Sequence, residues 1–379
     1  MRRALELASK ACGQTSPNPL VGAVLVKDSN IVGEGWHQCA GTPHAEIHAL
    51  EQAGKQAEGS TLYVTLEPCC HCGRTGPCSE AVIGSGVVRV VVAMTDPNPQ
   101  VSGQGITALK ASGIEVVTGV LADEAARMNE AFIKWISTGM PFITLKTAMS
   151  LDGKIATQTG NSKWITGELA RQRVHEYRNF SDAILTGIGT VLADDPELTT
   201  RLPGGGRSPI RVIVDRQART PLDSKVLLNN GSRVIIAVSD SSSKKSHAKL
   251  RQCGAEILLV PGTENRLDLS FLLCELGRRQ ITTVLVEAGS ALNASLLQEN
   301  LVDKLLVFIA PKIIGGKSAP GPIGGIGINS IDEALLLEDL TVERFGDDVM
   351  LSAYAVGRGG RDVYRSCARI GDSEVGCSR

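Results

Sequence analysis

The chain has 379 residues, of which 42% are hydrophobic and 21% are charged, and these proportions are typical of a soluble globular protein. This length is sufficient for two domains, each with its own hydrophobic core. The 39 Lys and Arg residues nearly balance the 40 Asp and Glu residues, so the sequence lacks the basic excess that a nucleic-acid coat or a membrane-surface protein needs.

The N-terminal residues predict an amphipathic helix rather than a targeting segment. They include two arginines, but no continuous apolar run and no small-residue cleavage site follow. Ala4, Leu5 and Ala8 recur at helical spacing instead. No apolar stretch is long enough to span a bilayer, and the ten cysteines of a chain without an export signal are more typical of thiols or metal ligands than of disulfides. We therefore expect a cytoplasmic protein.

Short β-branched runs alternate with helical patterns in the first part of the chain. Strands are predicted at 21–26, 61–66, 88–94 and 113–120, and helices at 44–54, 78–86 and 105–113. A further single helix is predicted over 123–138, closed by Gly139 and Pro141. The alternation predicts an α/β layered fold with a largely parallel sheet, and we place the domain boundary near residue 140.

The second part of the chain repeats this theme. Strand-like runs lie at 141–149, 182–192, 209–215, 232–239, 255–261, 282–289 and 303–311. The Gly/Pro-rich segment 315–327 is compatible with a mobile surface connection, and the Arg/Gly/Ser-rich tail from 357 is expected to be poorly ordered.

Two segments together carry a zinc deaminase signature. His44 and Glu46 form an H-x-E pattern at a predicted helix start, and Pro68-Cys69 open the run EPCCHCGRTGPC at 67–78. This combination is the general signature of zinc nucleobase deaminases. One imidazole and two thiolates leave one position on zinc open for a water molecule, whose pKa the metal lowers to near neutrality. Glu46, kept off the metal, would carry protons from that water to the ring and to the departing ammonia.

The third metal ligand is either Cys72 or Cys78. Cys69 and Cys72 match the C-x-x-C spacing literally. Cys78 follows Pro77 at a predicted helix start, where the helix dipole favours a thiolate, whereas Cys72 lies in a turn-like segment. We therefore favour His44, Cys69 and Cys78 as the ligands, with Cys72 as the alternative.

At these residues the chain resembles the bifunctional deaminase/reductases of riboflavin biosynthesis. The motifs that carry the resemblance lie at 16–26, 33–50, 65–78, 96–105, 145–156, 162–167, 190–201 and 286–297. They include SPNPLVGAVLV, TLEPCCHCGRTGPC and LKTAMSLDGKIA. The family's wide cysteine spacing supports Cys78 as the third ligand.

The resemblance implies an α/β fold with two domains. A cytidine-deaminase-like three-layer sandwich is expected over 1–140, a dihydrofolate-reductase-like domain over 141–356, and a tail over 357–379. The first domain is expected to use zinc to deaminate 2,5-diamino-6-(5-phosphoribosylamino)pyrimidin-4-one. The second is expected to use NADPH to reduce the ribosyl group of 5-amino-6-(5-phosphoribosylamino)uracil to a ribityl chain. Family analogy also suggests a homo-oligomer built through the second domain.

The resemblance also implies contact residues. Cofactor contacts are expected at Ala148, Trp164, Thr190, Asp194, Gly289, Ser290, Ala291, Leu292, Asn293, Ala294 and Ser295. Substrate contacts are expected at Asn18, Ser162, Arg178, Leu198, Arg201 and Glu287. The residue types agree, because a strand, a glycine turn and a helix start offer free N–H groups to a phosphate. The guanidinium groups of Arg178 and Arg201 suit a dianionic phosphate.

Arg216 departs from the family pattern. It lies near the expected cofactor site, where the family often has a small hydroxyl residue. An arginine there would pair with the 2′-phosphate of NADPH, which is a hypothesis that the cofactor preference of Arg216→Ser tests.

Two other functions predict different properties. A polynucleotide deaminase, for example one acting on tRNA, needs a basic surface and stacking aromatic residues. The formal net charge of −1 and the aromatic content of 3% disfavour it. A structural zinc module with a nucleotide-sensing domain would close the metal with a fourth protein ligand, and Cys72 is available for that role.

Overall fold

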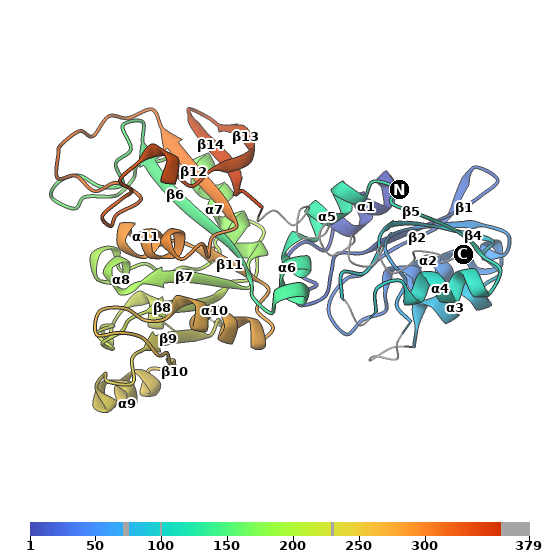
Figure 1. The fold of residues 1–379 in the computed structure, drawn as a ribbon, viewed down its shortest axis with the longest axis horizontal. Coiled ribbons are helices and arrows are strands. Elements are labelled where there is room, and N and C mark those ends of the chain that lie inside the picture. The colour runs from blue at the N-terminus through green and yellow to red at the C-terminus, as the bar shows by residue number, and fades with distance from the viewer. Residues whose placement is uncertain (71–75, 99–100, 229–230, 358–379) are drawn as a thin grey trace. The chain divides into compact units, whose positions relative to one another are not determined.

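The computed structural model describes residues 1–70, 76–98, 101–228 and 231–357, and the chain forms two compact units that divide between Gly139 and Met140 (Figure 1). His71, Cys72 and the predicted tail from residue 358 onward lie outside the described residues. Within those ranges, no helix has both the length and the apolar character needed to cross a membrane.

The first unit contains a five-stranded sheet with the order β2-β1-β3-β4-β5. Its strands are β1 (Gly22–Lys27), β2 (Asn30–Trp36), β3 (Thr61–Leu66), β4 (Arg89–Met94) and β5 (Glu115–Thr118). Its helices are α1 (Arg2–Ser9), α2 (Ala45–Ala53), the short 3-10 helix Gly54–Ala57, α3 (Cys78–Gly84), α4 (Gln104–Ala111), α5 (Ala122–Met128) and α6 (Glu130–Thr138). Helices α2, α3 and α4 share one core with the sheet, and α1 packs against a second set of strand side chains. Helices and sheet therefore form the expected three layers.

Strand β2 was not predicted from the sequence, and the sheet of this unit is mixed rather than largely parallel. β3, β4 and β5 are parallel, whereas β1 pairs antiparallel with β2 and β3. Gly33 and Gly35 interrupt the alternation of β2, but the packing requires glycine there. A Cβ at Gly35 would lie 2.2 Å from the carbonyl oxygen of Ala45, the first residue of α2. This close approach sets the position of the helix start that carries His44 and Glu46.

The single helix predicted over 123–138 is wrong, because α5 and α6 break at Asn129. The Asn129 side chain accepts a hydrogen bond from the Leu20 amide (2.8 Å) and donates one to the Leu20 carbonyl oxygen (3.0 Å). It thereby anchors the segment before β1, which contains Asn18. Helical periodicity within 123–138 gives no sign of this long-range contact.

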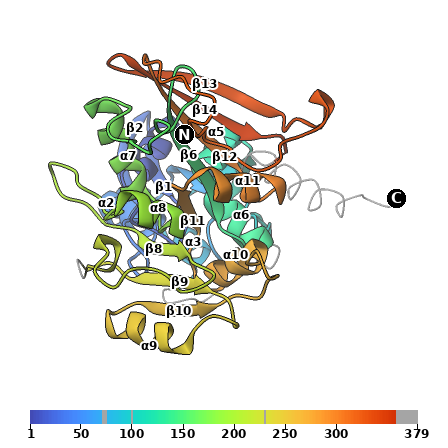
Figure 2. The same cartoon turned by 90° about the vertical axis from the view of Figure 1, so that its left-hand side faces the viewer.

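The second unit contains a nine-stranded sheet with the order β10-β9-β8-β7-β11-β6-β12-β14-β13, and β13 and β10 form its two edges (Figure 2). Its strands are β6 (Phe142–Ser150), β7 (Ala183–Gly187), β8 (Ile210–Val214), β9 (Val234–Val238), β10 (Glu256–Leu259), β11 (Thr283–Val286), β12 (Lys304–Ala310), β13 (Leu337–Phe345) and β14 (Asp348–Ala355). The strands from β10 to β12 in this order are parallel, and β14 and β13 continue the sheet antiparallel.

Helices cover both faces of this sheet. They are α7 (Glu168–Phe180), α8 (Ile188–Asp194), α9 (Lys244–Gln252), α10 (Leu269–Arg278) and α11 (Ser290–Gln298), with short 3-10 helices at Lys225–Leu227 and Ile331–Glu333. Neighbouring strand residues point to opposite faces. Leu185 thus belongs to a core with α10 and α11, and Ile184 to another with α8 and α9. Helix α7 packs on β12 and β14.

Two features of this unit differ from the sequence prediction. The run 182–192, predicted as strand-like, contains β7 followed by the start of α8. The hairpin of β13 and β14 was not predicted, because most of β13 is exposed and it carries charged residues among its leucines. A strand without one buried face lacks the alternating pattern by which strands are recognised.

Candidate functional site

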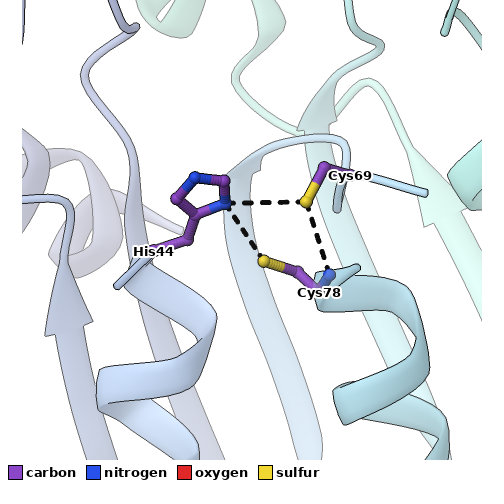
Figure 3. Close-up of side chains that lie close together, drawn as sticks. All are labelled: His44, Cys69 and Cys78. Carbon is purple, nitrogen blue, oxygen red and sulfur yellow. Dashed lines mark hydrogen bonds between the residues drawn. The ribbon is translucent and has the colours of Figure 1, made fainter. Parts of the chain in front are cut away.

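Three potential metal ligands meet in the first unit at the starts of two helices (Figure 3). His44 is the residue before α2, Cys69 follows β3, and Cys78 is the first residue of α3. The His44 Nδ1 atom lies 3.1 Å from the Cys78 Sγ atom and 3.5 Å from the Cys69 Sγ atom. The Cys78 amide donates a hydrogen bond to the Cys69 sulfur (3.3 Å), which holds the two cysteines together.

This donor set fits a zinc ion. The three ligand atoms all lie within 4.8 Å of one another. Tetrahedral zinc with a nitrogen at about 2.0 Å and a sulfur at about 2.3 Å places these two atoms about 3.5 Å apart, close to the spacings of His44 from the two sulfurs. Among the described residues, His44, Cys69 and Cys78 form the only group of three or more His, Cys, Asp or Glu side chains that could hold a metal ion. Cys72 lies outside them, so its role as an alternative ligand stays a prediction.

The pKa values of the two cysteine thiols are shifted in opposite directions. A hydrogen bond from the Cys78 thiol lowers the pKa of Cys69 to about 4, and the same contact raises the pKa of Cys78. A hydrogen bond with Cys69 also raises the pKa of His44. Cys69 is therefore ready to bind a cation as a thiolate, whereas Cys78 must release its proton to do so.

Glu46 lies in the first turn of α2 and is 3% exposed. Burial raises the pKa of this carboxyl group to about 7. Its Oε2 atom is buried and has no hydrogen-bond partner among the described residues. A carboxyl group that titrates near neutrality and has a free oxygen can both take up and release a proton, as a general acid and base must.

The structure adds His37, which the sequence analysis did not assign, to the surroundings of this cluster. The His37 ring is 2% exposed and contacts the His44 ring edge to face, with centroids 5.3 Å apart. Its Nδ1 atom lies 3.3 Å from the Pro43 carbonyl oxygen, so the proton is on Nδ1. Nε2 is then an acceptor for the Asn18 amide nitrogen at 3.0 Å. This arrangement turns the Asn18 side-chain nitrogen toward His37. Only the fold brings these two residues together.

Glu67, in the cysteine-rich run, has a structural role. Its buried carboxylate accepts hydrogen bonds from the amides of Asp96 (3.1 Å), Gly103 (2.9 Å) and Ile106 (3.1 Å). A Cβ at Gly105 would lie 2.0 Å from the Pro68 carbonyl oxygen. The motif at 96–105 thus packs directly on the segment that carries Cys69 and supports it.

Two adjoining cavities lie at the carboxyl ends of the parallel strands, within the described residues of the second unit. The first, of ≈ 780 Å³, is lined by Arg216 and by Gly289, Ser290, Ala291, Leu292, Ala294 and Ser295 at the start of α11. Asn293 lines the second cavity instead. The second, of ≈ 720 Å³, is lined by Ala148, Trp164, Arg178, Leu198, Arg201 and Glu287. Thr190, Asp194, Ser162 and Gly289 line both cavities. The structure therefore gathers the residues expected to contact cofactor and substrate around two adjoining spaces.

A buried ion pair forms one wall of the second cavity. The Arg178 guanidinium donates to both carboxylate oxygens of Glu287, at 2.6 and 3.0 Å, and Lys146 lies 3.5 Å from the same carboxylate. Burial favours the neutral acid, but the attraction of Arg178 and Lys146 is stronger and holds the pKa of Glu287 at about 2. Lys146 lies in the motif at 145–156 but was not singled out from the sequence, because nothing in that motif shows that its side chain meets Glu287.

Other predicted residues have identifiable partners. The Ser162 hydroxyl donates to the Asp194 carboxylate (2.8 Å). Trp164 is 63% exposed, and the Arg171 guanidinium lies 4.7 Å from its ring centroid. Asn293 donates to the carbonyl oxygen of Pro322 (2.9 Å), so part of the Gly/Pro-rich segment 315–327 is tied to α11.

Comparisons with known proteins identify relatives of both units. A protein-family model described as "RibD C-terminal domain" matches residues 141–351, and one described as "Cytidine and deoxycytidylate deaminase zinc-binding region" matches residues 1–94. The chain is 45% identical over 353 residues to the riboflavin biosynthesis protein RibD of Actinobacillus pleuropneumoniae. The aligned region covers 93% of this chain and 93% of that relative. The chain is also 44% identical over 363 residues to the protein of the same name from Escherichia coli (strain K12), covering 93% of this chain and 97% of the relative.

Solved structures with both domains are also similar. Acinetobacter baumannii RibD, form 1, is 42% identical and gives a TM-score of 0.84, over 94% of this chain and 97% of that chain. A Thermotoga maritima protein described as a diaminohydroxyphosphoribosylaminopyrimidine deaminase/5-amino-6-(5-phosphoribosylamino)uracil reductase is 38% identical, with a TM-score of 0.83 over the same shares.

The ion pair of Glu287 predicts a defined dependence of stability on pH. Because the folded-state pKa of about 2 lies below the value of about 4.3 for an exposed glutamate, the pair contributes fully above about pH 4.3. This contribution, about 3 kcal/mol, is lost as the pH falls toward 2. Urea unfolding at several pH values should show Glu287→Gln less stable than wild type at neutral pH, by a difference that shrinks in acid. Glu256→Gln removes a more exposed ion pair and should lower the free energy of unfolding by less than about 1 kcal/mol. A loss in Glu287→Gln that does not change with pH would contradict this account.

Proposed function

The chain belongs to the RibD family of riboflavin biosynthesis proteins, and from that premise we propose which of its residues carry out the two reactions. It is a bifunctional enzyme that uses zinc and NADPH. It deaminates 2,5-diamino-6-(5-phosphoribosylamino)pyrimidin-4-one and then reduces the ribosyl group of 5-amino-6-(5-phosphoribosylamino)uracil to ribityl. The observation that carries the assignment is the similarity over both domains, together with the cluster of His44, Cys69 and Cys78.

In the deaminase domain, His44, Cys69 and Cys78 hold the zinc ion, and Glu46 moves the protons. When bound, zinc with three protein ligands lowers the pKa of a water molecule to about 7 and so supplies hydroxide for attack on the ring. The buried Glu46 carboxyl group, whose pKa is about 7, takes up one proton from the attacking water and delivers it to the ring nitrogen. It then takes up the second proton of that water and delivers it to the amine, which leaves as ammonia. Asn18, oriented by His37, hydrogen bonds to the pyrimidine edge.

In the reductase domain, NADPH binds in the cavity over α11 and the phosphorylated pyrimidine binds in the adjoining cavity. The uncapped N–H groups at the start of α11 support the cofactor assignment, because no side chain caps this helix and a free helix N-terminus attracts phosphate. Thr190 and Asp194, which line both cavities, and Ala148 and Trp164, which line the adjoining cavity, complete the cofactor contacts where the two cavities meet. Substrate contacts fall to Ser162, Arg178, Leu198, Arg201 and Glu287. Because Thr190 and Asp194 line both cavities, hydride donor and acceptor can meet beside them.

The rival functions are less well supported. The relatives and both family models favour riboflavin biosynthesis over a polynucleotide deaminase. A structural zinc module would need a fourth protein ligand, such as Cys72, whereas the enzyme needs only three. The zinc measurements below distinguish these two hypotheses. The cytoplasmic location stays a prediction from the sequence.

Product analysis tests the two reactions and the role of Glu46. With the diamino-pyrimidinone phosphate alone, wild type should form a product heavier by about one mass unit, since oxygen replaces an amino nitrogen. Adding NADPH should add two hydrogens. Glu46→Gln should retain its fold and zinc but lose deamination by at least about 10³-fold, and should still reduce the deaminated substrate. Deamination at the wild-type rate in Glu46→Gln would refute the proton-transfer role.

Zinc content distinguishes the two cysteine ligand sets. Cys78→Ser should lose bound zinc and deaminase activity, because an alcohol is a poor replacement for a thiolate ligand. Cys72→Ser should keep close to one zinc per chain and its activity. Metal analysis after dialysis against a chelator gives the zinc content per chain of the two variants. Release of zinc by Cys72→Ser with retention by Cys78→Ser would instead favour the alternative ligand set.

We further propose that the reductase domain forms a homo-oligomer through strand β13. Large aliphatic side chains are exposed along one continuous stretch: Ile326, Ile328, Ile331, Leu335, Leu336, Leu337, Leu340 and Val342. β13 is also an edge strand, paired with β14 on one side. An exposed apolar edge invites association. Antiparallel pairing of two copies would cover both stretches at once, as a two-fold interface does.

Light scattering on the full chain tests this interface. Leu340→Asp should shift the protein to a smaller species, because the pairing would bury two carboxylates. Leu259→Asp, a matched control at the opposite edge of the sheet, where Leu259 is 48% exposed, should leave the mass unchanged. A monomeric wild type, or an equal response to both changes, would rule out the β13 interface.

A further inference from the structure

We propose that the loop 215–220 recognises the phosphate monoester on the adenosine ribose of NADPH through Arg216 and Arg219, and so sets the preference for NADPH over NADH. The inference rests on the proposed function, since it places NADPH in the cavity over α11. It extends the hypothesis for Arg216 to a second arginine and to the loop that presents both.

The cavity has two separate positions for negative charge. One is the N-terminus of α11, where Gly289 precedes the helix without a capping side chain. The other is the loop after β8, from which Arg216, Gln217 and Arg219 line the same cavity. NADPH likewise carries two separate anionic groups, a diphosphate and a monoester. If the diphosphate occupies the helix N-terminus, as expected for this geometry, the monoester is left for the arginines.

The order of the strands agrees with this placement. β8, β7 and β11 are consecutive and parallel in the sheet. The residues after β8, the start of α8 after β7 and the start of α11 after β11 therefore lie at one edge, and all three line the cavity. A dinucleotide that extends along this edge, from α11 past β7 to β8, reaches the loop with its adenosine end.

The loop 215–220 is held by a buried carboxylate. Asp215 is fully buried, and its Oδ2 atom accepts hydrogen bonds from the Thr220 amide (2.7 Å) and the Thr220 hydroxyl (2.8 Å). The Ala218 amide donates to the Asp215 carbonyl oxygen (3.0 Å), and the Arg216 carbonyl oxygen accepts from the Ser239 amide (3.0 Å). Its backbone is thus fixed, so the loop is ordered before any ligand binds. Preorganisation of this kind reduces the entropy cost of binding.

The two arginines also have their charges available. Across the described ranges, neither Arg216 nor Arg219 forms an ion pair with a carboxylate, whereas Arg233 and Arg279 of the same unit pair with Glu256. Two unpaired guanidinium groups can grip a dianionic phosphate with parallel hydrogen bonds. NADH offers a neutral hydroxyl at this position and gains no such contact.

Arg266, which lines the cavity as well, provides a contrast. Burial and the nearby Asp268 raise the pKa of Glu299, another lining residue, while the charge of Arg266 lowers it. The charge of Arg266 thus acts on one carboxyl group of the same cavity, that of Glu299. An arginine of the same cavity is therefore a matched control.

Steady-state reduction with the full-length enzyme tests the proposal. The ratio of kcat/KM for NADPH to that for NADH is measured on the deaminated pyrimidine phosphate. Arg216→Ser and Arg219→Ser should each lower this ratio by about tenfold or more, as expected for loss of a hydrogen bond between charged groups. The double variant should bring the ratio close to unity by weakening NADPH use, with NADH use changed little. Arg266→Ser should lower the ratio by less than about threefold, and the deamination rate of each variant checks that the chain is folded.

The affinities for adenosine 2′,5′-bisphosphate and for 5′-AMP, measured by titration, test the role of this loop without catalysis. Wild type should bind the bisphosphate more tightly than the monophosphate, and the double variant should not. A double variant that keeps the wild-type ratio of kcat/KM, or an effect of Arg266→Ser equal to that of Arg219→Ser, would overturn the proposal. Should wild type oxidise neither cofactor, the proposed function fails, and equal bisphosphate affinity of wild type and double variant would then reject the loop assignment separately.

Discussion

Removing a charged group from water costs free energy unless the fold supplies a compensating partner, and both active sites are organised around this cost. In the deaminase domain, Glu46 has no such partner on one oxygen, and its pKa rises to about 7. In the reductase domain, Glu287 is met by Arg178 and Lys146, and its pKa stays near 2. Two buried glutamates therefore have opposite protonation behaviour, because one is left with an unsatisfied oxygen and the other is paired.

The two domains place their polar groups by related means. Parallel strands end at a common edge of the sheet, so segments that are far apart in sequence meet there. Cys69 follows β3 in the first domain, and Gly289 follows β11 in the second. Helix N-termini at these edges add a favourable field for thiolate or phosphate. Buried carboxylates without a catalytic role, such as Glu67 and Asp215, then hold the neighbouring loops in place.

The features that sequence reasoning missed have a common cause. Strand β2 was overlooked because Gly33 and Gly35 weaken its pattern, although the close packing of α2 requires them. The break between α5 and α6 depends on a bond from Asn129 to Leu20, across 109 positions of sequence. His37 and Lys146 lie within the motifs at 33–50 and 145–156, but nothing in those motifs marks them, and they gain significance only from their neighbours in space. Such contacts leave no local periodicity in the chain.

The α/β class, most of the strands and helices, and the short motifs of the zinc deaminase signature could be predicted from the amino-acid sequence alone. This was possible because hydrophobic periodicity reports which face of an element is buried, and because the H-x-E and cysteine spacings are local in the chain. The folded chain was needed to show that His37 orients Asn18, that Arg178 and Lys146 pair with the charged Glu287, and that Arg219 joins Arg216 in the cavity over α11. These relations depend on distances between segments far apart in sequence, and such distances exist only once the sheets are assembled.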